Sequence, residues 1–303
     1  MFNIVSAGHF CIDSITLPGR NAPCVILGGS VTYVSLAARR LGAEVSIVSK
    51  VGEDFPKAYM WWLSQEGIDL STVVEVRDAK TTKFELEYDG DLSNRRLRLI
   101  SKGAQITVED LPKSLRAKVV HLGPIVNEIQ YEVAESLKKC AEVLSLDPQG
   151  LIRIFDENGN VTIGPLSDKR ILELVNIYKS SLDEIEAVTG QRDLKSAVNR
   201  VHDYGVENVI VTLGAKGAIL SVEGTMYNVP AYPPSKVVDP TGAGDAFIGG
   251  FLAEYVKGGD SLWCACVGSA VASTVVEGVG PTFFGDEDEI HRRARMLYEK
   301  GNK

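Results

Sequence analysis

One segment of the sequence, residues 238–247 (VDPTGAGDAF), combines residue types that could bind an anion and move a proton. Pro240 fixes its own φ and favours an extended residue before it, so a strand is expected to end here. Thr241 can cap the helix that follows, and Gly242 and Gly244 let a ligand come close to the backbone. Because a glycine-lined helix N-terminus presents free N–H groups and a partial positive charge, the segment predicts an anion site.

Asp245 adds a carboxylate in the first turn of the same predicted helix. The helix is expected over residues 243–256, because apolar residues recur along one of its faces. These residues are Phe247, Ile248, Phe251, Leu252 and Tyr255. A carboxylate beside an anion-binding helix end is useful as a base, so Asp245 is the first candidate for proton transfer.

Other interpretations of this segment must be weighed. On spacing alone, Asp245 could simply complement the dipole of an ordinary capped helix. A dinucleotide fingerprint G-x-G-x-x-G fails because Phe247 stands at the third glycine position. A Walker loop fails because the chain has no Gly-Lys-Ser/Thr. Gly249 and Gly250 each cost the helix about 1 kcal/mol relative to alanine, which indicates close packing against the next helix.

Length and charge exclude several classes of protein. The 303 residues suffice for one large α/β domain with an appendage. The net charge of −8 argues against a general nucleic-acid binder or a membrane-surface protein, which would need a basic face. No run of 18 apolar residues and no secretory leader is present, so no membrane span is expected.

The five cysteines are scattered and form no C-x-x-C pair, which predicts reduced thiols in a cytoplasmic protein. The four histidines form no H-E-x-x-H, so nothing indicates a zinc site.

The elements that must position the anion site alternate between strands and helices. Apolar strands are expected at residues 3–7, 24–27, 45–48, 119–122, 143–146 and 209–213. Helices are expected near residues 30–41, 55–65, 128–139, 171–176, 194–204, 243–256, 262–276 and 287–299. Strand–helix–strand alternation at this spacing predicts a parallel sheet with crossover helices.

The middle of the chain has a different pattern. Residues 81–88 and 96–100 alternate polar and apolar side chains around the turn Asp89-Gly90-Asp91, as exposed antiparallel strands do. With residues 13–23 they could form a small sheet that stands off the main domain. The expected units are a large α/β domain (residues 1–10, 28–72 and 104–303) and a small β lid (residues 11–27 and 73–103).

The stretch DPTGAGDAFIGGF at residues 239–251 closely resembles the C-terminal signature of the PfkB (ribokinase-like) carbohydrate kinase family. The glycine pair at residues 28–29, the helix that follows it and VGED at residues 51–54 resemble its N-terminal signature. The similarity runs in order through nearly the whole chain. It implies an α/β fold of the ribokinase-like type, a three-layer αβα sandwich with a mainly parallel central sheet and a small β-sheet lid.

The resemblance also implies roles for single residues. Asp245 matches the catalytic base of the family, and the backbone N–H groups of the anion hole match those of Gly242, Ala243 and Gly244. Asp13 matches the aspartate that binds substrate hydroxyls. Further candidate substrate positions are Gly28, Gly29, Tyr33 and Arg153. Arg153 could equally be a surface arginine on a strand.

The nucleotide-binding strand and turn of the family resemble the segment that contains Thr212, Gly214, Lys216 and Gly217. Glu184 matches the glutamate of the family's Asn-x-x-Glu element, which is linked to magnesium and phosphate binding. Ser181 stands where asparagine is usual in that element, so the chain departs from the family pattern at this position.

Two observations bear on the substrate. Tyr33 replaces an asparagine that often contacts the sugar in ribokinase-like members, which indicates a substrate other than ribose. Residues 8–13, 147–156 and 277–280 are most similar to myo-inositol kinases within the family.

The resemblance therefore implies a kinase that uses ATP and Mg²⁺ to phosphorylate a hydroxyl of a small sugar or cyclic polyol, with myo-inositol as one candidate. Ribokinase-, fructokinase- and nucleoside-kinase-like activities stay open, as does a non-catalytic sugar- or nucleotide-binding relative. A monovalent-cation requirement and the preferred phosphate donor also stay open. A homodimer through the lid and a monomer are both compatible with the sequence.

Overall fold

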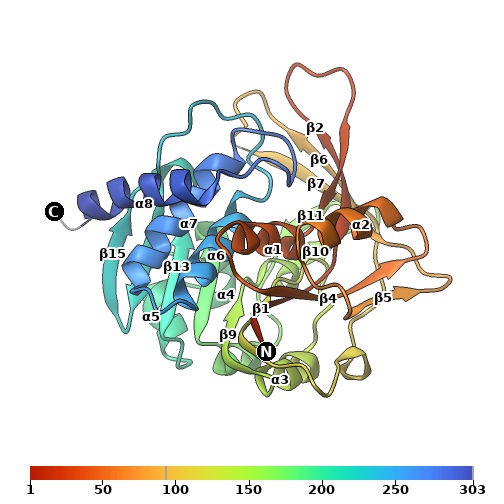
Figure 1. Cartoon of the computed structure of the whole chain (residues 1–303), viewed down its shortest axis with the longest axis horizontal. Coiled ribbons are helices and arrows are strands. Elements are labelled where there is room, and N and C mark those ends of the chain that lie inside the picture. Colours follow the sequence, from red (N-terminus) through yellow and green to blue (C-terminus); the bar gives the residue numbers. More distant parts are fainter. Residues whose placement is uncertain (93, 302–303) are drawn as a thin grey trace.

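The structure, a computed structural model, describes residues 1–92 and 94–301, and this part of the chain is built around a nine-stranded sheet (Figure 1). The strands are β1 Phe2–Ala7, β4 Val45–Gly52, β5 Val73–Val76, β8 Ala117–Leu122, β9 Ala141–Leu146, β12 Ile177–Ser181, β13 Asn208–Thr212, β14 Ala218–Val222 and β15 Thr225–Val229. Their order is β15-β14-β13-β12-β9-β8-β1-β4-β5. Neighbours from β13 to β5 are parallel, and β14 and β15 form an antiparallel edge. The mainly parallel sheet expected from the sequence is confirmed.

Helices cover both faces of this sheet. The helices are α1 Ser30–Arg40, α2 Lys57–Gln65, α3 Tyr131–Lys138, α4 Leu182–Thr189, α5 Leu194–His202, α6 Ala243–Tyr255, α7 Ser261–Val275 and α8 Glu287–Gly301. Successive strand residues alternate between faces: Ile4 joins the core beneath α1, α6 and α7, whereas Val5 joins the core beneath α3, α4 and α5. The three-layer architecture is therefore confirmed. Within the described residues, no helix combines the length and apolar character needed to cross a membrane.

The two glycines inside α6 let it lie close to two neighbouring helices. A β-carbon at Gly250 would meet Gly268 and Val271 of α7, as expected from the sequence. A β-carbon at Gly249 would instead meet Val34 and Ala37 of α1. The prediction of close packing is right for both glycines, but only one of them faces the following helix.

A separate four-stranded sheet forms the lid and stands off the large domain (Figure 1). Its strands are β2 Cys11–Thr16, β3 Cys24–Gly28, β6 Thr82–Tyr88 and β7 Arg95–Ser101, in the order β3-β2-β6-β7. Residues 73–76, expected in the lid, pair with β4 as strand β5 of the large sheet. The reason is the preceding helix α2, because a strand that follows a crossover helix commonly adds in parallel to its own sheet. A short hairpin, β10 Arg153–Phe155 and β11 Val161–Ile163, lies beside β7.

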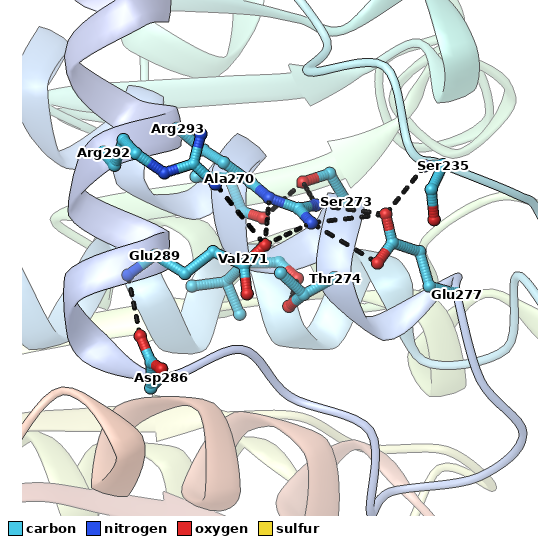
Figure 2. A network of polar contacts seen from close by, with 10 residues as sticks. All are labelled: Ser235, Ala270, Val271, Ser273, Thr274, Glu277, Asp286, Glu289, Arg292 and Arg293. Atoms are coloured by element: carbon cyan, nitrogen blue, oxygen red, sulfur yellow. Dashed lines mark hydrogen bonds and ion pairs between the residues drawn. The ribbon is translucent and has the colours of Figure 1, made fainter.

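A buried arginine ties α8 to α7 and to the segment that leads into residue 239. Figure 2 shows Arg293 of α8 pointing toward Ser273 and Glu277. Its guanidinium donates to the Ser273 hydroxyl at 2.9 Å, to the Glu277 carboxylate at 3.3 Å and to the Glu289 carboxylate at 2.6 Å. Glu277 also accepts from the backbone N–H of Ser235 at 2.8 Å. The network therefore anchors the chain just before the anion-site segment.

Arg293→Met should lower the free energy of unfolding by about 3 kcal/mol, because removing one partner leaves the Glu277 carboxylate poorly compensated. Arg292→Met is the matched control: this neighbouring side chain is 60% exposed and lies 3.7 Å from Glu289, so its loss should change stability by less than about 0.5 kcal/mol. Urea unfolding of both variants measures the difference. Equal losses would show that the Arg293 network does not stabilise the fold.

Candidate active site

A pocket lies between the lid and the large domain. Side chains of β2, β6 and β7 line it from the lid, and the start of α1, the start of α6 and the loops after β8 and β9 line it from the large domain. The loops after β8 and β9, and β2 shortly after β1, follow the carboxyl ends of parallel strands, where open α/β sheets usually bind ligands.

The start of α6 at this pocket has no side-chain cap. The N-cap residue is Gly242, in the left-handed conformation at φ 77°. Thr241, expected to cap the helix, does not do so: its hydroxyl donates to Asp239 Oδ1 at 2.6 Å. A β-carbon at Gly242 would collide with the ring of Tyr33. No side chain takes up the first N–H groups of the helix, although that of Ala243 donates to the backbone carbonyl of Pro240 at 3.3 Å. The helix end is therefore open to a ligand, as the predicted anion site requires.

Asp245 lines the pocket, and a short chain of hydrogen bonds orients its carboxylate. Gln149 Nε2 donates to Asp245 Oδ1 at 3.0 Å. Arg153 donates to Gln149 Oε1 at 2.7 Å and to the backbone carbonyl of Ile125 at 3.0 Å. Arg153 therefore belongs to the pocket and is not a surface residue. Gln149 was missed by the sequence analysis, because only the fold brings the loop after β9 to α6.

Asp13 faces the same pocket from β2 and is 5% exposed. Its Oδ1 accepts from the Cys11 thiol at 2.9 Å. Burial raises the pKa of Asp13 to about 6, against the lowering effects of the Cys11 hydrogen bond and of the positive charges on Arg95 and Arg153. A β-carbon at Gly28 would collide with the Asp13 carboxylate, and Gly29 lines the pocket. The substrate positions expected from the sequence are thus brought together.

A chain of hydrogen bonds connects the lid to Thr241, which precedes the N-cap residue of α6. Arg95 of β7 donates to the Tyr88 hydroxyl at 3.2 Å, and Tyr88 lies 2.9 Å from the Thr241 hydroxyl. Since Thr241 donates onward to Asp239, its oxygen accepts from Tyr88. Arg95 lines the pocket. The sequence analysis did not identify it, because the alternating pattern of this segment predicted an exposed strand.

The expected nucleotide-binding residues lie at the ends of two adjacent parallel strands. Ser181 ends β12 and pairs with Thr212 at the end of β13. Beyond β13, an exposed turn contains Gly214 and Lys216 and ends at the buried Gly217, whose φ is 94°. These residues do not line the pocket that contains Asp245.

Ser181 and Glu184 form a capping box at the start of α4. Glu184 Oε2 accepts from the backbone N–H of Ser181 at 2.7 Å, and the Ser181 hydroxyl accepts from the N–H of Glu184 at 3.4 Å. One carboxylate oxygen of Glu184 is therefore engaged locally. Among the described residues, no group of three or more His, Cys, Asp or Glu side chains forms a metal cluster.

A buried ion pair lies beside the start of α6 and was not singled out from the sequence. Lys179 of β12 donates to Asp147 Oδ2 at 2.6 Å, and the two residues are 5% and 1% exposed. Burial raises the pKa of Asp147 to about 7, although the positive charge of Lys179 lowers it. A lysine inside the strand sequence IYKSS was the signal available.

The chain is similar in sequence to known carbohydrate and nucleoside kinases. The model of the pfkB family carbohydrate kinases matches residues 3–288. The chain is 32% identical to a cytidine kinase of Thermococcus kodakarensis, over 91% of this chain and 97% of that one. It is 28% identical to an inositol 3-kinase of Arabidopsis thaliana, over 97% and 81%.

Solved structures have the same ribokinase-like fold. A nucleoside kinase of Methanocaldococcus jannaschii matches with a TM-score of 0.77 at 26% identity, over 98% of this chain and 99% of that one. A pyrophosphate-dependent kinase of the ribokinase family, solved with a pyrophosphate analogue and myo-inositol, matches with a TM-score of 0.80 at 22% identity, over 96% and 99%. The expected fold is confirmed, and the second likeness concerns the fold alone.

Gly242→Ala should cost about 2–4 kcal/mol of stability, because the new methyl group meets the Tyr33 ring and alanine disfavours a positive φ. Gly190→Ala is the matched control: its φ of 73° is similar, but open space surrounds it, so only the backbone cost of about 1–2 kcal/mol applies. Thermal unfolding compares the two. Equal losses would mean that the start of α6 does not pack tightly on Tyr33.

Proposed function

We propose that this chain, which belongs to the pfkB family of carbohydrate kinases, transfers the γ-phosphoryl group of ATP to a hydroxyl of a small sugar or cyclic polyol, with myo-inositol as the first candidate. The observation that carries the proposal is the Asp245 carboxylate, which lines a pocket at the uncapped start of α6. This arrangement supplies a base and an anion site within one helical turn.

In the proposed mechanism, Asp245 accepts the proton of the attacking hydroxyl. A bond forms between that oxygen and the γ-phosphorus, and the bond from the γ-phosphorus to the bridging oxygen of ADP breaks. The N–H groups of residues 242–244 hold the charge on the transferred phosphoryl group, since phosphoryl transfer depends mainly on positioning and electrostatics. Gln149 keeps the Asp245 carboxylate turned into the pocket through its 3.0 Å hydrogen bond.

Magnesium fits the donor side of the site. Glu184 leaves one carboxylate oxygen free of the capping box, and Mg²⁺ bound to nucleotides often takes only one or two protein carboxylates. When bound, the ion would neutralise charge on the β- and γ-phosphates. Thr212, Gly214, Lys216 and Gly217, at the end of β13, are the proposed contacts of the nucleotide.

Asp239 fits a monovalent cation. Its side chain is 1% exposed, and within the described chain its Oδ2 is buried without a hydrogen-bond partner. An uncompensated buried carboxylate oxygen is costly, and a potassium-sized cation would compensate it. We therefore include a monovalent cation in the proposal.

The acceptor side favours a molecule with several hydroxyl groups. Ser30 and Tyr33 line the pocket, and their hydroxyl groups are buried without a hydrogen-bond partner among the described residues. Leaving such groups unsatisfied costs about 1–3 kcal/mol each, and substrate hydroxyls would satisfy them. Together with the Asp13 carboxylate they could bind three hydroxyls around a ring.

A nucleoside is the second candidate. Phe84, Leu86 and Leu97 give the lid side of the pocket an apolar surface on which a base could stack. The likeness to a cytidine kinase favours this alternative. The edge strand β3 of the lid is compatible with pairing to a second copy of the chain, and equally with a monomer.

ADP release in the presence of Mg²⁺ and ATP, with a panel of myo-inositol, ribose, fructose and cytidine, tests the acceptor. We expect the highest kcat/KM for myo-inositol, with KM raised severalfold in Tyr33→Phe while the KM for ATP is unchanged. A higher kcat/KM for cytidine would show that the acceptor is a nucleoside and not a polyol. No turnover with any acceptor would contradict the proposed reaction.

Asp245→Asn should lower kcat by roughly 10²- to 10⁴-fold, the usual contribution of a positioned base, with the melting temperature close to wild type. Single-turnover measurements at saturating ATP and acceptor isolate the chemical step. A variant that keeps most of its turnover would show that another group accepts the proton.

A further inference from the structure

Lys179 occupies an unusual place for a charged side chain. It lies on β12 in the middle of the large sheet and is 5% exposed. Its ammonium donates to Asp147 Oδ2 at 2.6 Å, and this is its one hydrogen bond within the described part of the chain. An ammonium carries three N–H donors, so two remain for another partner.

The free side of the ammonium faces the start of α6. A β-carbon at Gly244 would lie 2.7 Å from Lys179 Nζ and 3.5 Å from its Cε. The glycine therefore lets the ammonium approach the backbone of the first helical turn. The positive charge of Lys179 and the N–H groups of residues 242–244 converge on the same small region.

Electrostatics keep this lysine charged. Burial disfavours the ammonium, but the carboxylates of Asp147, Asp245 and Glu184 outweigh burial and raise the pKa of Lys179 above its ordinary value. Three carboxylates therefore surround one ammonium, and this local excess of negative charge keeps Lys179 protonated. A fixed cation at this point would act on the incoming phosphate without a change of protonation.

We propose that Lys179 is a further catalytic residue, whose ammonium contacts the phosphoryl group that is transferred, and that Asp147 is the positioning residue that holds it. This inference rests on the proposed function. The ammonium donates hydrogen bonds to the non-bridging oxygens of the phosphoryl group and keeps its proton throughout. We do not assign Lys179 a contact with the nucleoside part of ATP, because its ammonium lies beside the start of α6, whereas the proposed nucleotide contacts lie in the turn at residues 214–217.

The paired variant Lys179→Met/Asp147→Asn tests the inference without leaving a buried carboxylate unpaired. We expect kcat to fall by about 10²- to 10³-fold, the usual effect of removing one donor to developing charge, while the KM for the acceptor stays within about threefold. Asp147→Asn alone keeps the ammonium, so its kcat should fall by less than about tenfold.

Lys50→Met/Asp110→Asn is the matched control. Lys50 and Asp110 also form a largely buried pair, at 2.7 Å, but outside the pocket. Their removal should lower the melting temperature and leave kcat unchanged. If both paired variants lost the same stability and neither lost kcat, Lys179 would be purely structural and the inference would be overturned.

Binding measurements separate this inference from the proposed function. Calorimetry with a non-hydrolysable ATP analogue and with ADP, both with Mg²⁺, should show the paired variant at Lys179 losing about tenfold in affinity for the analogue and little for ADP. Equal losses for both ligands would overturn the contact to the transferred group. If the wild-type protein bound neither ligand, the proposed reaction with ATP would be wrong. The role of Lys179 would then be tested with whichever phosphate donor supports turnover, and a paired variant Lys179→Met/Asp147→Asn that kept its kcat with that donor would overturn the inference.

Discussion

Helix α6 begins at a left-handed glycine, and no side chain caps its first N–H groups. An uncapped and partly buried helix end is unfavourable unless a ligand completes it, so the surrounding structure has to hold it in place. Tyr33 packs against Gly242, Lys179 lies beneath Gly244, and α1 contacts Gly249. None of these approaches tolerates a larger residue without movement. The position of the anion site is thus fixed by close backbone packing on three sides.

The polar groups around this helix end form two connected systems. On one side, Arg153 and Gln149 orient the Asp245 carboxylate. On the other, hydrogen bonds run from Arg95 of the lid through Tyr88 to Thr241, next to the N-cap glycine of the helix. The lid is therefore connected to the start of α6 by direct contacts. Closure of the lid on an acceptor would act on the same backbone that we propose binds the phosphate, and the closed lid would keep water away from the transfer.

The sequence indicated this site because its main signals are local. Glycines next to Asp245 and the apolar periodicity after it predict the helix and its free end. The partners that come from elsewhere, such as Gln149 and Arg95, depend on which loops the fold brings together and have no local signal. Strand β12 was not predicted, since the polar residues in IYKSS hide a buried parallel strand. The prediction that Thr241 caps α6 was wrong for a similar reason. The turn before the helix places the Thr241 hydroxyl next to Asp239, to which it donates instead.

The central claim is that phosphate transfer takes place between the Asp245 carboxylate and the free end of α6. A crystal structure with ADP, magnesium, aluminium fluoride and the preferred acceptor tests it most directly. We predict the fluoride group within hydrogen-bond reach of the N–H groups of residues 242–244, and an acceptor hydroxyl about 3 Å from an Asp245 oxygen. A fluoride group bound away from this helix end, or an Asp245 carboxylate turned out of the pocket, would contradict the account.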